Sequence, residues 1–97
     1  MATGAKGYVI LTEAIQDPEG MKAYGQAAGA AMGGVKVLAV DAKPQVLEGD
    51  WHGHQTVVLE FESVEAARAW YDSEAYRAAR VLRQAAADTN AVILSGF

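Results

Sequence analysis

The chain has 97 residues, 52% of them hydrophobic, and a formal net charge of -4. This length suits one small domain, and the apolar fraction is high enough to suggest a partner surface. The eight lysines and arginines form no basic run, which argues against a nucleic-acid-binding protein that relies on phosphate contacts. Because the chain has no cysteine, disulfides, thiol nucleophiles and cysteine-bound metals are excluded.

The N-terminal sequence and the hydropathy favour a cytoplasmic protein. The first apolar run is only four residues long, which is too short for the core of a secretory signal. No stretch approaches the roughly eighteen apolar residues that a membrane helix needs. We therefore expect a cytoplasmic protein with no nucleic-acid partner and no membrane partner.

The pattern predicts a disordered tail over residues 1–5 and a single domain over residues 6–97. Strand-forming and helix-forming stretches alternate along that domain. The expected elements are, in chain order, a strand at 6–14, a helix bounded by Asp17 and Gly33, a strand at 35–41, a short edge strand at 46–48, a strand at 55–62, a helix from Ser63 to about Ala87 that breaks at 72–74, and a strand at 90–96.

Capping residues mark the expected helix starts. Asp17 can cap the first helix, and Pro18 suits its first position because the missing N–H has no partner there. Ser63 is a natural cap for the next helix, and Ser73 provides a second cap at the break. Residues at helical spacing should form the buried stripe of the first helix: Met21, Tyr24, Ala28, Ala31 and Met32.

The order of the elements, βαββαβ, suits a ferredoxin-like α+β sandwich. Right-handed crossovers would place both helices on one face of the sheet. In the third long strand Val57, Leu59 and Phe61 recur at every second position and should face the helices, whereas the opposite face is mixed. Together with the first strand, this alternation predicts both the covered and the bare face of the sheet.

The bare face should carry Tyr8, Ile10 and Val58, which makes it too apolar to remain in contact with water. Two copies that pack sheet against sheet would cover it and enclose a partly polar cleft. We therefore predict a homodimer with two-fold symmetry.

Several runs resemble one known family: KGYVI at 6–10, DPE at 17–19, GG at 33–34, LEGDW at 47–51, VVLEF at 57–61 and AARAWYDSEAY at 66–76. Together they resemble the family catalogued as domain of unknown function 1330. The resemblance covers the chain from Lys6 onward and implies a ferredoxin-like protomer that forms a dimeric α/β barrel, without implying an activity. Gln55 and Glu62 depart from the family, whose members usually carry a basic residue and a proline there. If that basic residue binds an anion in relatives, this chain lacks it.

Glu60 is the first candidate for a catalytic residue. On the bare face of a central strand its carboxylate would lie in the dimer cleft, and partial desolvation should raise its pKa toward values useful for a general base. The alternative is an ion pair with a lysine or arginine, or hydration at the mouth of the barrel.

His52 and His54 form a His-x-His pattern beside Asp50, which would suit a metal if the segment were a strand. The segment contains glycine and lacks a third histidine, so a solvated loop is the favoured interpretation and we predict no metal. His54 is kept as a second catalytic candidate, because a histidine over the cleft would titrate near neutrality.

Aromatic and polar side chains supply the candidate ligand-binding residues. Trp70 and Tyr71 differ by about 100° around a helix, so one should be buried and the other should lie at a boundary. Arg80 and Arg83 share a face with Tyr76 and would suit an anionic ligand, unless that face is simply solvated. The full predicted set is Tyr8, Asp50, Trp51, Trp70, Tyr71, Ser73, Tyr76 and Arg80.

Two functions remain open at this stage. In the first, the chain is a small-molecule enzyme whose cleft between sheet and helices uses Glu60 with Tyr71 or His54 as acid–base groups. Its reaction would be an isomerisation or a cofactor-free oxidation of a small carbonyl or carboxylated compound. In the second, it is a non-catalytic ligand-binding or structural dimer. No phosphate-binding loop and no dinucleotide fingerprint is present, so we expect no cofactor.

Overall fold

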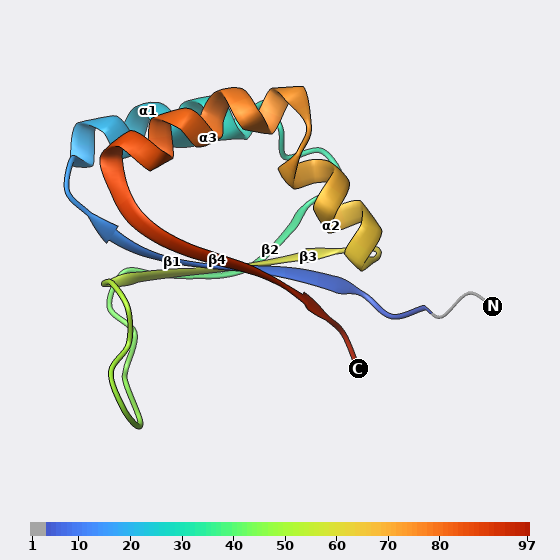
Figure 1. Ribbon diagram of the computed structural model, residues 1–97, viewed down its shortest axis with the longest axis horizontal. Helices are drawn as coiled ribbons and strands as arrows, with labels where there is room; N and C mark the ends of the chain where they lie inside the picture. The colour runs from blue at the N-terminus through green and yellow to red at the C-terminus, as the bar shows by residue number, and fades with distance from the viewer. Residues whose placement is uncertain (1–3) are drawn as a thin grey trace.

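The computed structural model describes residues 4–97 as an antiparallel sheet with helices on one face (Figure 1). The elements are β1 (Gly7–Ile15), α1 (Pro18–Gly29), β2 (Lys36–Asp41), β3 (Gln55–Phe61), α2 (Val64–Tyr71), α3 (Glu74–Ala86) and β4 (Ala87–Ser95). The strands are ordered β2-β3-β1-β4, as in a ferredoxin-like fold. Of the tail predicted at 1–5, residues 1–3 lie outside the described part of the chain.

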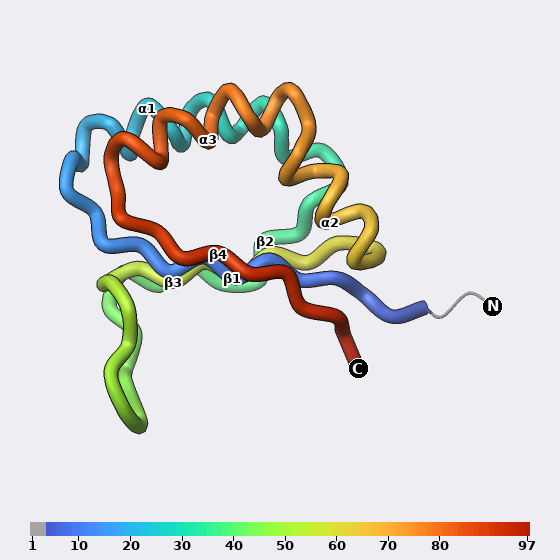
Figure 2. Tube along the Cα trace, in the orientation of Figure 1, coloured from blue at the N-terminus to red at the C-terminus, as the bar shows by residue number. Residues whose placement is uncertain are grey.

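Helices α1 and α3 lie side by side over the sheet (Figure 2). The shorter α2 lies on the same side of the sheet, at the end where β3 finishes. The backbone N–H of Gly96 donates to the carbonyl of Lys6, which ties the end of β4 to the residue that precedes β1. No helix within residues 4–97 is long and apolar enough to cross a membrane.

Two of the predicted strand positions are wrong. The short edge strand expected at 46–48 is absent, because β2 ends at Asp41 and the following segment leaves the sheet. This connection, residues 42–54, projects from the sheet on the side opposite the helices (Figure 1). The last strand begins at Ala87 rather than at 90, because α3 runs directly into β4 and Ala87 already pairs with Ile15.

The predicted break between the second and third helices is confirmed. The Ser63 hydroxyl accepts a hydrogen bond from the N–H of Ala66 at 3.0 Å and caps α2. The Ser73 hydroxyl accepts from the N–H of Tyr76 at 3.2 Å and caps α3. Asp17 occupies the N-cap position of α1, although its side chain makes no capping hydrogen bond.

The alternation predicted for the two central strands is also confirmed. Leu11, Leu59 and Phe61 are buried between the sheet and the helices. On the other face β1 pairs Tyr8 with Glu60, and the neighbouring β4 leaves large apolar side chains half exposed. The sheet therefore has one covered face and one bare face.

Candidate functional site

A row of polar side chains crosses three strands at one end of the covered face. Gln55 of β3 pairs with Glu13 of β1, and Glu13 pairs in turn with Thr89 of β4. Glu13 lies two positions beyond Leu11, so the alternation of β1 points it toward the helices, and it is only 1% exposed. The Gln55 amide donates to the Glu13 carboxylate at 2.8 Å. The Thr89 hydroxyl is buried and has no hydrogen-bond partner among residues 4–97.

The helices place a second polar group above this row. The hydroxyls of Tyr24 in α1 and Tyr76 in α3 lie 2.8 Å apart. Arg83 lies two turns beyond Tyr76 on the same face of α3, donates through Nε to the Tyr76 hydroxyl at 3.4 Å and is 2% exposed. Buried polar groups of this kind require partners, because an unpaired one costs about 1–3 kcal/mol.

Burial acts strongly on Tyr24. Desolvation and then the hydrogen bond with Tyr76 raise the pKa of Tyr24 far above the ordinary value of a tyrosine. The phenol is therefore neutral at physiological pH, and it can donate a hydrogen bond to a ligand.

An opening of about 220 Å³ gives access to the polar row from the β2 side of the sheet. Glu13, Tyr24 and Gln55 provide its polar lining. Gly25 and Gly29 face it from α1, and a Cβ at either position would contact nothing within 4 Å. The remaining lining is apolar: Leu11, Ala28, Met32, Val37, Val40, Val57, Leu59 and Trp70.

The predicted aromatic residues of α2 and α3 lie on this covered side. Trp70 is buried and donates through Nε1 to the carbonyl of Ala31 at 2.8 Å, whereas Tyr71 is half buried. This is the division that their angular offset predicted. Tyr76 is fully buried and stacks on Trp70 with a centroid separation of 4.0 Å.

Ser73 and Arg80 serve local structure in this protomer. Besides capping α3, the Ser73 hydroxyl donates to the carbonyl of Trp70 at 2.7 Å. The Arg80 guanidinium lies 4.5 Å from the centre of the Tyr71 ring and also donates to the Tyr71 carbonyl at 3.3 Å. Neither residue lines the opening beside Glu13.

Glu60 and Tyr8 lie on the bare face, away from the helices. The Tyr8 hydroxyl donates to the Glu60 carboxylate at 3.0 Å, and this hydrogen bond is the main reason why the pKa of Tyr8 is raised. The expectation that Glu60 and Tyr71 share a cleft between sheet and helices is wrong within one protomer. Their strand and helix positions put them on opposite sides of the sheet.

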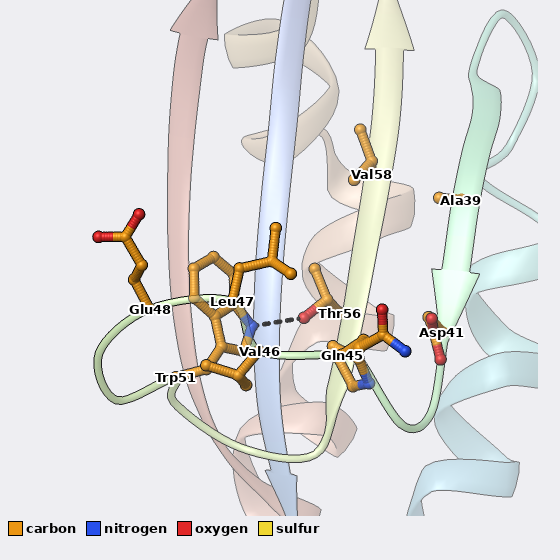
Figure 3. A pocket seen from close by; sticks show the side chains of 10 residues that line it. Ala39, Asp41, Gln45, Val46, Leu47, Glu48, Trp51, Thr56 and Val58 are labelled. Atoms are coloured by element: carbon orange, nitrogen blue, oxygen red, sulfur yellow. Dashed lines mark hydrogen bonds between the residues drawn. The ribbon is translucent and has the colours of Figure 1, made fainter.

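Asp50 and Trp51 belong to the projecting connection between β2 and β3, and Figure 3 shows Trp51 there. Asp50 is exposed, and the Trp51 indole donates to the Thr56 hydroxyl at 2.8 Å. An opening of about 390 Å³ separates this connection from the bare face, bordered by Leu47, Trp51 and Val58. Trp51 is thus brought to the bare face, opposite Glu13, whereas Asp50 does not line this opening.

His52 and His54 do not converge. The His52 ring bonds to the Thr12 hydroxyl at 2.7 Å and approaches Asp88 at 3.4 Å. His54 is exposed, and its backbone N–H donates to the carbonyl of Glu13. Within residues 4–97 no cluster of three histidine or acidic side chains is arranged to hold a metal ion.

Sequence reasoning missed Glu13 and Gln55 as site residues, and it weighed Arg83 as part of an anion-binding face without including it in the predicted set. The signal for Glu13 was present, because it continues the inward-facing series of Val9 and Leu11. Its pairing with Gln55 joins residues 42 positions apart and required the register of the sheet.

Comparison with known proteins places the chain among small proteins of unassigned activity. Residues 6–97 match the family described as a domain of unknown function, DUF1330. A protein of unknown function from Rhodopseudomonas palustris has a similar structure, with a TM-score of 0.75, 24% identity, and coverage of 98% of this chain and 85% of that chain. No match to a curated protein was found.

Two further solved structures are described as dimeric ferredoxin-like proteins of unknown function. The one from Thermobifida fusca YX has a TM-score of 0.67 and 20% identity, and the alignment covers 98% of this chain and 94% of that chain. The one from Bacteroides fragilis NCTC 9343 has a TM-score of 0.62 and 13% identity, with both chains covered completely. At these identities the likeness establishes the fold.

Proposed function

This chain belongs to the DUF1330 family, and we propose that it is an isomerase-type enzyme that moves a proton within a small carbonyl compound. The substrate would occupy the opening between α1 and the sheet, beside Glu13, Tyr24 and Gln55. Such a reaction is redox-neutral, so it requires no electron acceptor and agrees with the expectation of no cofactor.

The observation that carries this proposal is the position of Glu13. Its carboxylate is almost completely buried, lines an opening, and has only the Gln55 amide as a hydrogen-bond partner within residues 4–97. No lysine or arginine of that part of the chain forms an ion pair with it. A buried acid without a cation is costly for stability, and such groups are enriched at functional sites.

Tyr24 is positioned to assist Glu13 by binding the substrate carbonyl. Arginine can only donate, so the Tyr76 hydroxyl accepts from Arg83. This favours Tyr76 as the donor to Tyr24, which leaves the Tyr24 hydrogen free for a ligand. A neutral phenol directed at a carbonyl oxygen stabilises the negative charge that develops on that oxygen during proton removal.

The chemical step conserves all atoms. Glu13 removes a proton from the carbon next to the carbonyl, and the C–H electron pair forms an enolate whose oxygen accepts from Tyr24. Glu13 then returns the proton to a carbon of the same molecule. Gln55 orients one carboxylate oxygen through its 2.8 Å hydrogen bond, so the other oxygen is the base.

Hydrogen–deuterium exchange tests the proposal without knowledge of the natural substrate. A panel of small ketones and 2-oxo acids in D₂O would be followed by NMR for deuterium uptake next to the carbonyl. Glu13→Gln should lower the exchange rate by about 10²–10⁴-fold, since general acid–base groups contribute that much. Glu62→Gln, at an exposed acid paired with Lys6, is the matched control and should be unchanged. Failure of the wild-type protein to exchange any of the compounds, or equal rates in Glu13→Gln, would refute the proposal.

We further propose that the active form is a homodimer joined through the bare sheet faces, as an α/β barrel. The dimeric ferredoxin-like neighbours support this, as do the half-exposed Val92 and Leu94, which are 52% and 49% exposed. Val92→Lys should yield a monomer in sedimentation analysis, because it places a charge within the interface. Val81→Lys on α3 is the control, since Val81 is similarly exposed at 62% but lies in the helix layer. Equal sedimentation of both variants as dimers would contradict this interface.

A non-catalytic dimer is the second candidate, and the contact between Tyr8 and Glu60 favours it. Glu60 already has a hydrogen-bond partner within its own protomer, so a structural role in the interface accounts for its position. In that case the wild-type protein should catalyse no deuterium exchange, and Glu60→Gln should change only the dissociation constant of the dimer. A loss of exchange in Glu60→Gln with the dimer intact would instead assign chemistry to the bare face.

A further inference from the structure

A second opening reaches the buried polar residues from the β4 side of the sheet. It has a volume of about 390 Å³ and lies between α3 and the start of β4. Thr89 forms part of its lining and is paired with Glu13 across the strands, so the two openings flank this pair. The lining consists of Tyr71, Arg83, Gln84, Ala87, Asp88, Thr89 and Ala91.

Arg83 enters this opening with most of its hydrogen-bonding capacity unused. An arginine side chain carries five N–H donors, yet the only hydrogen bond of Arg83 within residues 4–97 runs from Nε to Tyr76 at 3.4 Å. No carboxylate of that part of the chain lies within ion-pair distance of it. The residue is only 2% exposed, so this cation has little contact with solvent and no carboxylate partner within residues 4–97.

Thr89 provides an independent sign of a missing partner. Its hydroxyl is the one buried side-chain oxygen or nitrogen within residues 4–97 that makes no hydrogen bond. Alternation along β4 directs it to the same side of the sheet as Ala87 and Ala91. An unsatisfied buried hydroxyl destabilises the unliganded fold, and a ligand oxygen would satisfy it.

We propose that Arg83 and Thr89 form a binding site for the carboxylate of a small organic acid. The two terminal nitrogens of Arg83 match the two oxygens of a carboxylate, and the Thr89 hydroxyl donates to one of them. Most of the remaining lining is polar, with Ala87 and Ala91 as its small apolar members, so the opening suits a short acid better than one with a large apolar body.

The charges favour a carboxylate over a phosphate. Arg83 is the only basic side chain that lines this opening in the described chain, and no helix begins there. Asp88 also borders the opening, but strand alternation turns its side chain toward the bare face, where it approaches His52. One cation with an acid at the rim suits a monoanion better than a phosphate dianion.

This site does not depend on proton transfer at Glu13, because binding is measured without turnover. The probes are acetate, butyrate and phenylacetate, each with its neutral amide as the matched compound, and inorganic phosphate. NMR titration of the native protein, following the Arg83 Nε–H and the Thr89 methyl group, would give the dissociation constants at fixed ionic strength. Glu13→Gln is the control variant and should retain carboxylate binding, which separates this site from the proposed chemistry.

Thr89→Val is the decisive variant, because it keeps the shape of the side chain and removes only the hydroxyl. It should leave the unliganded protein equally stable or more stable, yet weaken carboxylate binding by about 3- to 10-fold, as expected for one hydrogen bond. Arg83→Lys should weaken binding by about 10-fold or more, since a lysine cannot form the paired contact.

If Thr89→Val binds carboxylates as tightly as the native protein, Thr89 is not a ligand and the proposal is overturned. Equal binding of the amides, or tighter binding of phosphate than of any carboxylate, overturns it as well. Should Arg83→Lys fail to fold, the Thr89→Val titration still decides the question.

Discussion

Replacing Gly53 by alanine should destabilise the protein far more than the same change at Gly49. Both glycines lie in the connection between β2 and β3, and both have a φ of +72°. In each case alanine must adopt a left-handed conformation, which costs about 1–2 kcal/mol. This shared cost makes Gly49→Ala the matched control.

The two positions differ in what an added Cβ would meet. At Gly49 it meets nothing within 4 Å, whereas at Gly53 it would lie 2.5 Å from the carbonyl carbon and oxygen of Glu13 and 2.9 Å from the nitrogen of Ala14. Relief of this clash must move the connection away from β1. That movement breaks the 3.1 Å hydrogen bond from His54 to Glu13, which contributes about 1 kcal/mol, in addition to lost packing.

We expect Gly53→Ala to lower the free energy of unfolding by about 2–4 kcal/mol more than Gly49→Ala. The backbone cost is shared and cancels, so this difference consists of the lost hydrogen bond and the lost packing. Urea denaturation at one fixed protein concentration would measure both, since dimer stability depends on concentration. If the two variants lose the same free energy of unfolding within about 0.5 kcal/mol, the backbone of β1 near Glu13 can shift at little cost to accommodate the added Cβ. In that case the close approach of Gly53 does not fix the position of the carboxylate.

The remaining predictions concern Tyr24 and the helix caps. Because the pKa of Tyr24 is raised in the folded state, the unfolded chain loses this proton first, and stability should fall above about pH 10 by up to about 1.4 kcal/mol per pH unit. Tyr24→Phe should reduce that slope in urea denaturation between pH 8 and 11, and an unchanged slope would contradict the burial of the phenol. Ser63→Ala should cost about 1 kcal/mol through its lost cap. Ser73→Ala should cost more in thermal denaturation because Ser73 also bonds to Trp70, whereas Ser95→Ala should have no effect.

Local patterns in the sequence were sufficient to predict most of the fold. The alternation around Leu59 and Phe61 identified the covered face, because the side-chain period of a strand is fixed by its geometry. Ser63 and Ser73 identified the helix starts, because their hydroxyls satisfy backbone donors within three residues. Both kinds of signal act over short distances along the chain.

The polar site depends on distant pairings, which such patterns do not contain. Glu13 meets Gln55 only through the register of β1 and β3, and it meets Thr89 only through β4. Ala87 and Asp88 have weak strand preference, so the helix was predicted to continue to about Ala87 and the strand to begin only at residue 90. Pairing with the end of β1 overrides that preference and brings Thr89 into the site.

The direct junction between α3 and β4 sets the phase of the final strand. The carbonyl of Ala86 accepts hydrogen bonds from the N–H groups of Gln16 and Asp17, so the last helical residue is anchored to the turn that precedes α1. With no intervening loop to absorb a change in length, one residue inserted here would invert every side chain of β4. Asp88 would then point into the interior beside the buried Glu13, and Thr89 would point outward. Over evolutionary time this junction should therefore tolerate substitutions but not insertions or deletions of single residues.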